Sequence, residues 1–297
     1  MIYLRSIKFP KDKTRPYPYV IPSIKDLKNV EFSSITIFAG SNGSGKSTIL
    51  NVIAEKMNTY VPGEKTIGNI SGYFNWFVSK CRCEFAKLGN KDALPASCKL
   101  IKSEDIMDII NVRRKVNEKT EKQFDYGKNK TLNGLDEEMF GVGIQEQELT
   151  NSQRFHRSLL KGYNCNLHDH AKDIRDELSN GETSINRFEE LMIDDDSLYL
   201  LDEPENSLSP KMQLKLIEMI QECAKYFNCQ FIIATHSPFM LSLGASKSAK
   251  LEARIYDLDN IPVQTKHWHQ LENIKEYAEL FFANKLCFET QNNHSES

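Results

Sequence analysis

The sequence predicts an α/β fold built on a mostly parallel sheet, and three observations support this prediction. A β-rich run occurs at 31–39, and short apolar runs of strand length occur at 198–201 and 230–234. Apolar residues at helical spacing follow the first run and also separate the second run from the third. Strands separated by a helix pair in parallel through a right-handed crossover. With 297 residues, of which 40% are hydrophobic, the chain can bury one sizeable core.

Local signals set the expected limits of the helices. The first helix follows a strand and a glycine-rich turn and spans 48–57. In the helix between the two later strands, Ser209 can serve as the N-cap, Pro210 fits the first turn and Asn228 ends the helix. Each helix is therefore expected to pack its apolar face against the sheet.

The ends of the chain add further elements. Ile2, Leu4 and Ile7 alternate with polar residues, which predicts a half-buried edge strand. Near the other end, a last strand is expected at 254–258 and a helix at about 272–285. These elements complete the predicted core.

A change in composition suggests an insertion into this core. We expect one domain over residues 1–288, with a core made of 1–57 and 178–288. Residues 58–177 combine clustered aromatics with long polar stretches, which favours a mainly helical inserted lobe. The polar tail, 289–297, is expected to be disordered.

The overall charge limits the classes of partner. Lys and Arg number 38 and Asp and Glu number 41, so the net charge of −3 argues against coating nucleic acid through bulk charge. A basic stretch at 113–130 is either a solvated face or a surface for phosphates or a partner. No apolar run is long enough to cross a bilayer or to resemble a signal peptide, which predicts a soluble cytoplasmic protein without direct membrane insertion.

The seven cysteines do not form a disulfide pattern. They are scattered, and a chain of this size without a secretion signal is expected to keep them as reduced thiols. The alternative is a zinc site, although the spacing differs from that of a standard finger. Its candidate ligands are Cys81, Cys83, Cys98, Cys165, His168 and His170.

The strongest chemical signal is a glycine-rich loop, GSNGSGKS at 40–47, between the first buried strand and the first helix. Glycines let the backbone N–H groups turn toward a phosphate, and the helix adds its positive end. We expect Lys46 to reach the β- and γ-phosphates of ATP and the Ser47 hydroxyl to ligate Mg²⁺. The expected nucleotide-binding residues of this loop are Gly40, Ser41, Asn42, Gly43, Ser44, Gly45, Lys46, Ser47 and Thr48.

Two later strands deliver polar residues to the same expected sheet edge. The strand LYLL at 198–201 is followed by Asp202 and Glu203, and the strand ending at Ala234 is followed by Thr235 and His236. Adjacent acids at a buried strand end are costly unless positive charge is near. Asp202 is therefore a candidate Mg²⁺ ligand, and Glu203 a candidate base for the attacking water. Lys46, Glu203 and His236 form the predicted catalytic set.

A third segment precedes a predicted amphipathic helix. In LSNGE at 178–182, Ser179, Asn180 and the Gly181 amide lie at a helix start, where anions bind favourably. This segment alone would be a weak signal, but it occurs in order with the other motifs.

Together these motifs resemble those of the ATP-binding-cassette (ABC) class of ATPases. LSNGE resembles its signature motif, LLDEPENSLS at 200–209 its Walker B strand and D-loop, and His236 its switch histidine. The resemblance implies a P-loop NTPase with an ABC-type head: a mostly parallel core sheet, N-terminal antiparallel strands and an inserted helical lobe. It also implies a head-to-tail homodimer on ATP binding, in which Ser179, Asn180 and Gly181 of one protomer cap the nucleotide held by Lys46 of the other.

Within this class the residues of these motifs are similar to those of a soluble branch rather than to those of transport cassettes. That branch contains SMC and DNA-repair ATPase heads, overcoming-lysogenization-defect ATPases and a family of small AAA-type ATPases. This chain departs from the pattern of the class at Asn180, which replaces a signature glycine, and at Ser209, which replaces the D-loop aspartate.

Two features of such sites have more than one candidate here. The glutamine that normally joins the core to the lobe has two expected replacements: Ser103 or Glu104, which follow the strand-like segment 98–102 and precede a helix, or else Gln153. Tyr17 or Tyr19 stacks on adenine, or else has an ordinary packing role in its proline-rich loop.

The expected function is Mg²⁺-dependent ATP hydrolysis that drives a dimer switch in DNA repair or antiphage defence. A nuclease or another effector protein is the expected partner, and nucleic acid is left open as a further one. The alternatives are an energising ATPase subunit of a membrane transporter and a regulatory module that turns ATP over slowly. Fold analogy alone does not separate these biological roles.

Overall fold

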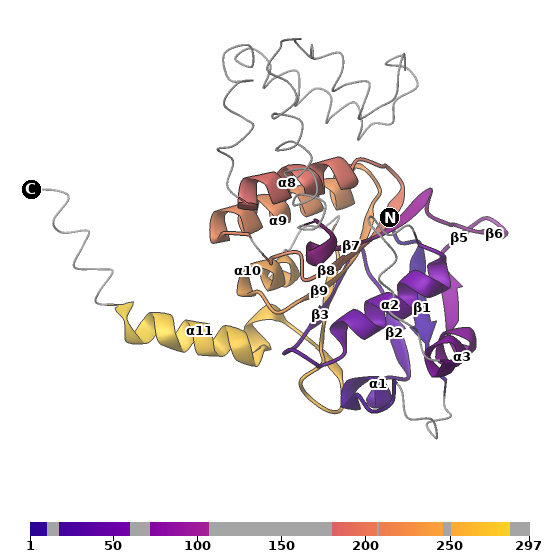
Figure 1. Cartoon of the computed structure of the whole chain (residues 1–297), viewed down its shortest axis with the longest axis horizontal. Helices are drawn as coiled ribbons and strands as arrows, with labels where there is room; N and C mark the ends of the chain where they lie inside the picture. The colour runs from indigo at the N-terminus through magenta and orange to yellow at the C-terminus, as the bar shows by residue number, and fades with distance from the viewer. Residues whose placement is uncertain (11–17, 60–71, 107–179, 207, 246–250, 286–297) are drawn as a thin grey trace, which may run out of the picture.

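A six-stranded sheet in the order β11-β10-β3-β9-β8-β7 runs through the centre of the protein (Figure 1). The computed structural model describes residues 1–10, 18–59, 72–106, 180–206, 208–245 and 251–285. The strands are β3 (Ile35–Ala39), β7 (Ser97–Lys102), β8 (Ser197–Asp202), β9 (Gln230–Thr235), β10 (Ala253–Asp257) and β11 (Gln264–Lys266). Every neighbouring pair is parallel except β10 and β11, which confirms the predicted α/β class with a mostly parallel sheet.

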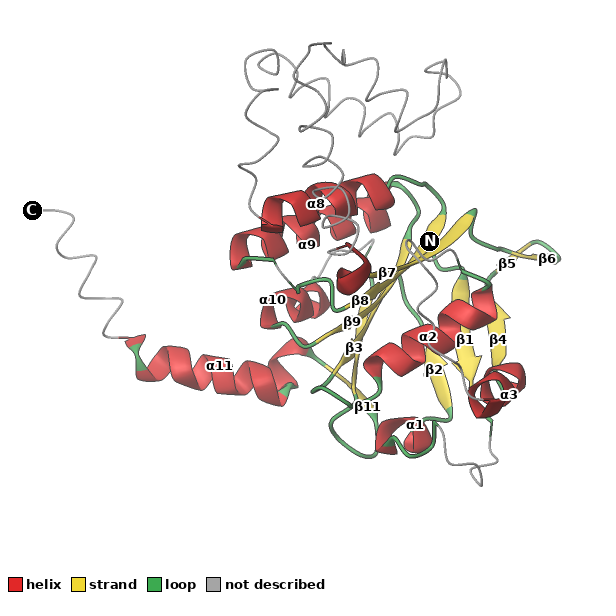
Figure 2. Ribbon diagram, viewed as in Figure 1, coloured by secondary structure: helices red, strands yellow, loops and turns green. Residues whose placement is uncertain are grey.

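Helices cover both faces of this sheet (Figure 2). One face carries α1 (Pro22–Asp26), α2 (Lys46–Met57) and α3 (Gly72–Lys80). The opposite face carries α8 (Asn180–Leu191), α9 (Pro210–Tyr226), α10 (Pro238–Leu241) and the 3₁₀ turn η3 (Ser242–Ala245). Because both faces are covered, every residue of β3, β8 and β9 is buried, which explains their continuous apolar runs.

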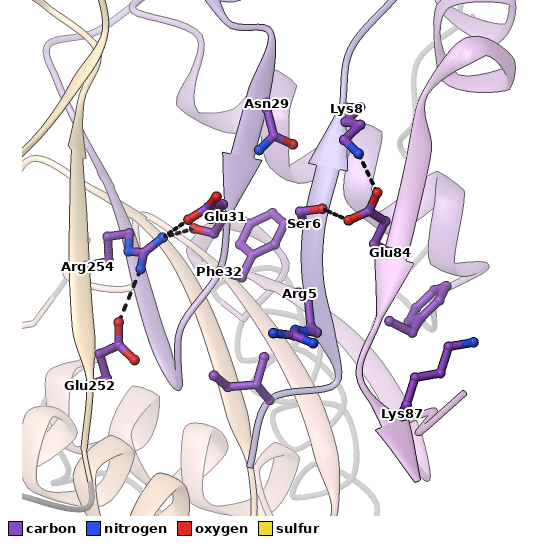
Figure 3. A pocket seen from close by; sticks show the side chains of 12 residues that line it. Arg5, Ser6, Lys8, Asn29, Glu31, Phe32, Glu84, Lys87, Glu252 and Arg254 are labelled. Carbon is purple, nitrogen blue, oxygen red and sulfur yellow. Dashed lines mark hydrogen bonds and ion pairs between the residues drawn. The ribbon is translucent and has the colours of Figure 1, made fainter. Parts of the chain in front are cut away.

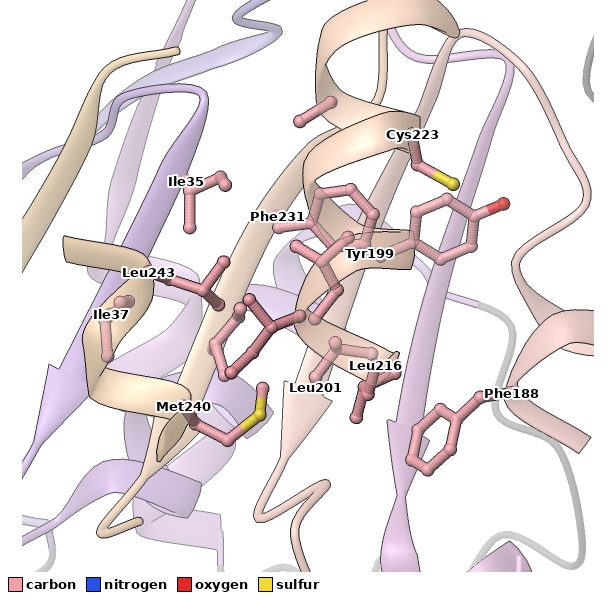
Figure 4. Close-up of a cluster of buried hydrophobic side chains, with 14 of the residues drawn as sticks. Ile35, Ile37, Phe188, Tyr199, Leu201, Leu216, Cys223, Phe231, Met240 and Leu243 are labelled. Atoms are coloured by element: carbon pink, nitrogen blue, oxygen red, sulfur yellow. The ribbon is translucent and has the colours of Figure 1, made fainter. Parts of the chain in front are cut away.

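The core on the α8 and α9 side is built from residues that alternate along the strands (Figure 4). Tyr199 of β8 stacks on Phe231 of β9, with 5.3 Å between ring centroids. The Tyr199 hydroxyl donates to the backbone O of Asp194 and accepts from its N–H, so this buried polar atom is satisfied. Phe188 of α8 and Leu216 of α9 join the same cluster.

A second, antiparallel sheet packs beside α2 and α3, in the order β2 (Asn29–Glu31), β1 (Leu4–Lys8) and β4 (Arg82–Phe85). The N-terminal strand therefore lies in the middle of this sheet, and the prediction of an edge strand is wrong. The buried side chain of Gln230 joins the two sheets. Its Oε1 accepts from the N–H groups of Tyr3 and Leu4, and its Nε2 donates to the carbonyls of Leu4 and Ser33.

The predicted lobe boundary at residue 58 needs a correction. Within 58–177, α3 packs against the core, β4 belongs to the antiparallel sheet and β7 pairs in parallel with β8. A short hairpin, β5 (Lys87–Leu88) with β6 (Lys91–Asp92), lies between them. The first part of the predicted helical lobe is thus core. Residues 107–179 and the tail lie outside the described residues, as does the basic stretch at 113–130.

The predicted helix limits differ from the structure by a few residues. Ser209 Oγ accepts from Met212 N–H at 3.4 Å, so the predicted cap of α9 is confirmed. The helix ends at Tyr226, and Asn228 follows with a left-handed φ of 55°. Near the C-terminal end of the described residues, η4 (Trp268–Gln270) precedes α11 (Glu272–Ala283). Helix α11 extends away from the body of the protein in Figure 1. No described helix combines the length and apolarity needed to span a bilayer.

Candidate functional site

The carboxyl ends of the central strands meet at one edge of the sheet. Register pairs Ala39 of β3 with Thr235 of β9, and Asp202 of β8 with Ala234 of β9. The loops that follow these three strands therefore start side by side. In parallel sheets such an edge is where ligands bind.

The glycine-rich loop joins β3 to α2 and has a conformation that requires glycine. Gly43 and Gly45 have φ values of 83° and 102°, which L-residues rarely adopt. A Cβ on Gly45 would also lie only 3.0 Å from side-chain atoms of Ile21 and Ser23. The other predicted nucleotide-binding residues of this segment, Gly40, Ser41, Asn42, Ser44 and Thr48, lie in the same loop and in the first turn of α2.

Lys46 begins α2 and folds back into this loop. Its Nζ donates to the carbonyls of Gly40 at 2.8 Å and Ser41 at 3.0 Å, and the residue is only 3% exposed. The same Nζ lies 3.5 Å from Oε1 of Glu203. The loop thus encloses a positive charge that faces the carboxylate at the end of β8.

Ser47 and Asp202 form the second contact between the loop and β8. Ser47 Oγ donates to Asp202 Oδ1 at 2.9 Å. Burial raises the pKa of Asp202 to about 6, although the Ser47 hydrogen bond acts in the opposite direction. A hydroxyl and a buried carboxylate that lie side by side are hard oxygen donors of the kind that Mg²⁺ prefers, so these residues fit the predicted ion.

Glu203 adopts a left-handed backbone conformation with φ 46°, which is unusual for a residue other than glycine. Its N–H donates to the carbonyl of Ala234 at 2.9 Å, and its carbonyl accepts from the hydroxyl of Ser103. The side chain accepts from Nδ2 of Asn206 at 3.2 Å. Contacts from two neighbouring strand ends therefore hold the predicted base in place.

His236 lies on the loop after β9, within reach of the same carboxylate. Its Nδ1 is 3.8 Å from Oε1 of Glu203 and 3.4 Å from Oε1 of Glu205. The imidazole is about half exposed, with 47% of the side chain accessible. Asn273 of α11 donates from Nδ2 to the His236 carbonyl at 3.3 Å. The structure thus brings the predicted catalytic residues, Lys46, Glu203 and His236, to one place.

The predicted signature residues are only partly described. Ser179 lies outside the described residues, and α8 begins at Asn180, inside the motif rather than after it. For Asn180 and Gly181 the structure describes the helical backbone only. Helix α8 packs on α9, on the face of the sheet opposite α2 (Figure 1).

The structure describes some of the candidates for the residue that replaces the joining glutamine and for the tyrosine that could stack on adenine. Ser103 follows β7 and contacts the Glu203 carbonyl, whereas Gln153 lies outside the described residues. Tyr19 is buried, donates its hydroxyl to the Pro10 carbonyl at 2.7 Å and packs edge-on against Phe77. Tyr19 therefore has the packing role, and Tyr17 lies outside the described residues.

Several residues that contact the site were not predicted. Glu205, Asp259 and Asn273 are not among the predicted site residues. Asp259 accepts from Ser41 N–H through both carboxylate oxygens at 2.9 Å and from the Ser41 hydroxyl at 2.7 Å. Only Glu205 carried a sequence signal, because it is a further acid directly after the Asp-Glu-Pro segment.

A surface groove of about 740 Å³ lies elsewhere, between β1, β2, β4 and β10 (Figure 3). Its volume suits a small molecule. However, most of its charged residues pair with one another: Lys8 with Glu84, and Arg254 with Glu31 and Glu252. None of its lining residues comes from the glycine-rich loop or from the ends of β8 and β9. We therefore locate the candidate site at the sheet edge, not in this groove.

The cysteines of the described residues are free thiols, and burial raises their pKa values. The pKa is about 12 for Cys81 and about 11 for both Cys83 and Cys98. Within the described ranges, no group of three or more His, Cys, Asp or Glu side chains is arranged to hold a metal. The other candidate zinc ligands, Cys165, His168 and His170, lie outside those ranges.

Comparison with known proteins gives a partial sequence match. A segment of 81 residues is 32% identical to the ABC transporter ATP-binding protein YtrE of Bacillus subtilis (strain 168). The segment covers 27% of this chain and 35% of YtrE, so the match spans about a third of that relative.

Two solved structures are similar over most of the chain. The SMC head domain from Thermotoga maritima is 15% identical with a TM-score of 0.42, and 90% of this chain and 99% of that one are covered. CbiO1 from Clostridium perfringens, part of the ABC transporter complex cbiONQ, is 14% identical with a TM-score of 0.46, and both chains are covered completely.

A family model gives the widest sequence match. The family described as "AAA domain, putative AbiEii toxin, Type IV TA system" matches residues 64–242, which is more than half of the chain. The match includes the strand ends that carry Asp202, Glu203 and His236, and it begins after the glycine-rich loop. The protein is therefore a member of this AAA-domain family, in agreement with its resemblance to ABC-class ATPases of the AAA type.

Proposed function

We propose that the protein binds ATP and hydrolyses it with Mg²⁺ at the sheet edge formed by β3, β8 and β9. One observation carries this proposal: residues from distant motifs contact one another in two pairs. Ser47 Oγ lies 2.9 Å from Asp202 Oδ1, and Lys46 Nζ lies 3.5 Å from Glu203 Oε1. A cation, a hydroxyl and two carboxylates at a helix N-terminus match the groups that phosphoryl transfer uses.

Each residue has a distinct task in this proposal. The loop N–H groups and Lys46 bind the phosphates, while Ser47 and Asp202 would hold Mg²⁺. The ion supplies positive charge that neutralises the phosphate oxygens. Glu203 orients the attacking water and accepts its proton, since its carboxylate faces the loop. His236 contacts the terminal phosphate from the end of β9.

We further propose a head-to-tail homodimer that forms when ATP binds. In this arrangement Ser179, Asn180 and Gly181 of one protomer complete the nucleotide site of the other. The position of α8 supports this idea, because α8 and α2 cover opposite faces of the sheet. The signature helix of one chain thus lies across the sheet from the helix that follows its own glycine-rich loop.

The biological role is proposed to be antiphage defence or DNA repair together with a partner protein. The description of the family names a putative toxin of a type IV toxin–antitoxin system. From the resemblance of the motifs to those of DNA-repair ATPases, we propose a nuclease or another effector as the partner, with nucleic acid as a further one. The cytoplasmic location stays a prediction.

One observation favours a second candidate, an ATPase subunit that energises a membrane transporter. YtrE, which matches 81 residues of this chain, is described as an ABC transporter ATP-binding protein. This candidate predicts co-purification with a membrane-embedded partner, whereas the leading proposal predicts an effector protein.

The variant Glu203→Gln tests the ATPase proposal. It should leave ATP binding intact and lower kcat by about 10²- to 10⁴-fold, since the variant lacks the base. The ATP-bound variant should then accumulate as a dimer, which gel filtration with light scattering detects. Glu55→Gln makes the same chemical change on the exposed face of α2 and should behave like the wild type. An unchanged turnover in Glu203→Gln would remove Glu203 from its proposed role.

A further inference from the structure

Glu205 is a buried acid beside the candidate site for which sequence reasoning gives no role. Its side chain is only 5% exposed. Within the described residues its one ion-pair partner is the imidazole of His236, and no lysine or arginine pairs with it. A buried carboxylate without a strong cationic partner is costly, so its hydrogen bonds must account for its presence.

Those hydrogen bonds all converge on the loop that carries His236. Oε1 of Glu205 accepts from Thr235 Oγ1 at 2.6 Å, from His236 N–H at 3.0 Å and from Ser237 N–H at 3.2 Å. Donors from three consecutive residues thus meet at one oxygen. This arrangement fixes the backbone of His236 relative to the loop after β8, from which Glu203 also comes.

The imidazole itself lies against the same carboxylate. Nδ1 of His236 is 3.4 Å from Oε1 of Glu205, closer than its distance of 3.8 Å to Glu203. A carboxylate beside Nδ1 can fix the orientation of the ring through that nitrogen, and Nε2 is then the ring nitrogen that can contact a phosphate. The other oxygen, Oε2, is buried without a hydrogen-bond partner among the described residues. An apolar residue at position 205 would avoid the free-energy cost of burying an oxygen without a partner. The carboxylate of Glu205 therefore has a role beyond packing.

We propose that Glu205 is the positioning residue for His236: it holds the His236 loop and orients the imidazole, so that His236 and Glu203 act on the same phosphate. The inference rests on the proposed ATPase function and adds a residue to that site. Glu205 acts through His236 and is not proposed to touch the substrate.

A second tether of the same loop provides a matched control. Ser237 Oγ donates to Oε1 of Gln213 at 2.6 Å, and Gln213 Nε2 donates to the Leu208 carbonyl at 3.0 Å. This tether joins the His236 loop to α9, and neither of its two hydrogen bonds involves His236. Gln213→Ala therefore removes a loop anchor while leaving the Glu205–His236 contact in place.

The test is a double-mutant cycle in the full chain, with ATP turnover as the readout. Glu205→Ala should lower kcat by about 10- to 100-fold with KM for ATP changed less than about threefold, since phosphate binding by Lys46 is intact. In a His236→Ala background the same change should lower kcat by less than about twofold, because the histidine that Glu205 positions is gone. Gln213→Ala should lower Tm but leave kcat within about twofold of the wild type.

A milder variant covers the case in which Glu205→Ala does not fold. Glu205→Gln keeps an oxygen that can accept the three hydrogen bonds but loses the charge beside Nδ1. It should lower kcat about fivefold in the wild-type background and leave it unchanged in His236→Ala. Circular dichroism and thermal melting report whether each variant is folded.

The outcomes separate this inference from the proposed function. If the wild type neither binds nor hydrolyses ATP, the proposed function fails. If the wild type hydrolyses ATP, three results overturn only the inference. The first is a kcat that is unchanged in the Glu205 variants, and the second is a double mutant in which the kcat losses of Glu205→Ala and His236→Ala multiply. The third is a loss of kcat in Gln213→Ala equal to that in Glu205→Ala. A His236→Ala variant with full activity would also overturn it, because Glu205 would then have no histidine to act through.

Discussion

Asp202→Asn should stabilise the protein in the absence of Mg²⁺ while removing its Mg²⁺-dependent activity. Burial raises the pKa of Asp202 from its ordinary value of 3.8 to about 6. At 1.36 kcal/mol for each pH unit, this difference corresponds to roughly 3 kcal/mol. The asparagine carries no charge, and its carbonyl oxygen can still accept the hydrogen bond from Ser47.

The sign of the effect follows from which state holds the proton more tightly. Because the pKa of Asp202 is higher in the folded protein than in the unfolded chain, the folded protein binds this proton more strongly. Its contribution to the free energy of unfolding is present below about pH 4 and is lost as the pH rises through about 6. At pH 7.5 the variant should therefore be more stable than the wild type by up to about 3 kcal/mol, whereas at pH 4 the two should differ little.

The measurement is urea unfolding followed by circular dichroism in EDTA, at several pH values between 4 and 7.5. The matched control is Asp92→Asn, because Asp92 lies in the exposed β5–β6 hairpin and pairs with Lys87. That change should have almost no effect. An Asp202→Asn variant that is less stable than the wild type at pH 7.5, or that differs equally at both ends of the range, would refute the argument from burial.

Two further variants test how the loop binds phosphate. Lys46→Ala should weaken ATP binding by at least about tenfold, because it removes the ammonium enclosed by the loop; titration with a fluorescent nucleotide measures this, and wild-type affinity would contradict the loop assignment. Asp259→Ala should weaken ATP binding several-fold, by roughly 1 kcal/mol, since it frees the Ser41 end of the loop. The same titration checks this second variant, and an affinity equal to that of the wild type would mean that Asp259 does not set the loop conformation.

The parallel core could be predicted because its signals are local. The strands β8 and β9 are continuous apolar runs with a capped amphipathic helix between them, and this pattern implies parallel pairing. The register that follows brings Asp202 level with Ala234. The candidate residues at the ends of these strands could therefore be located from the sequence alone.

The edges of the fold could not be predicted in the same way. The alternation of apolar residues in β1 shows that one face is buried, but it does not identify the neighbouring strands. The edge strand β7, SCKLIK, is only partly buried, and its Lys99 reaches Asp194 at 2.7 Å. Residues 98–102 do resemble a strand in sequence, but the clustered aromatics and long polar stretches around them favoured an insertion that begins at residue 58.

The contacts around the motifs were also not predictable, since they join residues that lie far apart in the sequence. Ser103 contacts the carbonyl of Glu203, and Asp259 contacts Ser41 across 218 positions of the chain. The motifs identify the residues that chemistry requires at fixed spacing. The residues that hold them come from other loops, and no local pattern marks them.

The conformation of Glu203 shows how two adjacent acids come to serve one site. Successive side chains of a strand point to opposite faces of the sheet. Asp202 contacts Ser47 on the α2 side, so an extended strand would direct Glu203 toward the α8 and α9 side. The left-handed φ of 46° interrupts the strand at this residue, and its Oε1 lies 3.5 Å from Lys46. This conformation costs about 1–2 kcal/mol in a residue other than glycine. The hydrogen bonds from Ser103 and to Ala234 offset that cost, so the pair of acids depends on contacts that its own motif does not contain.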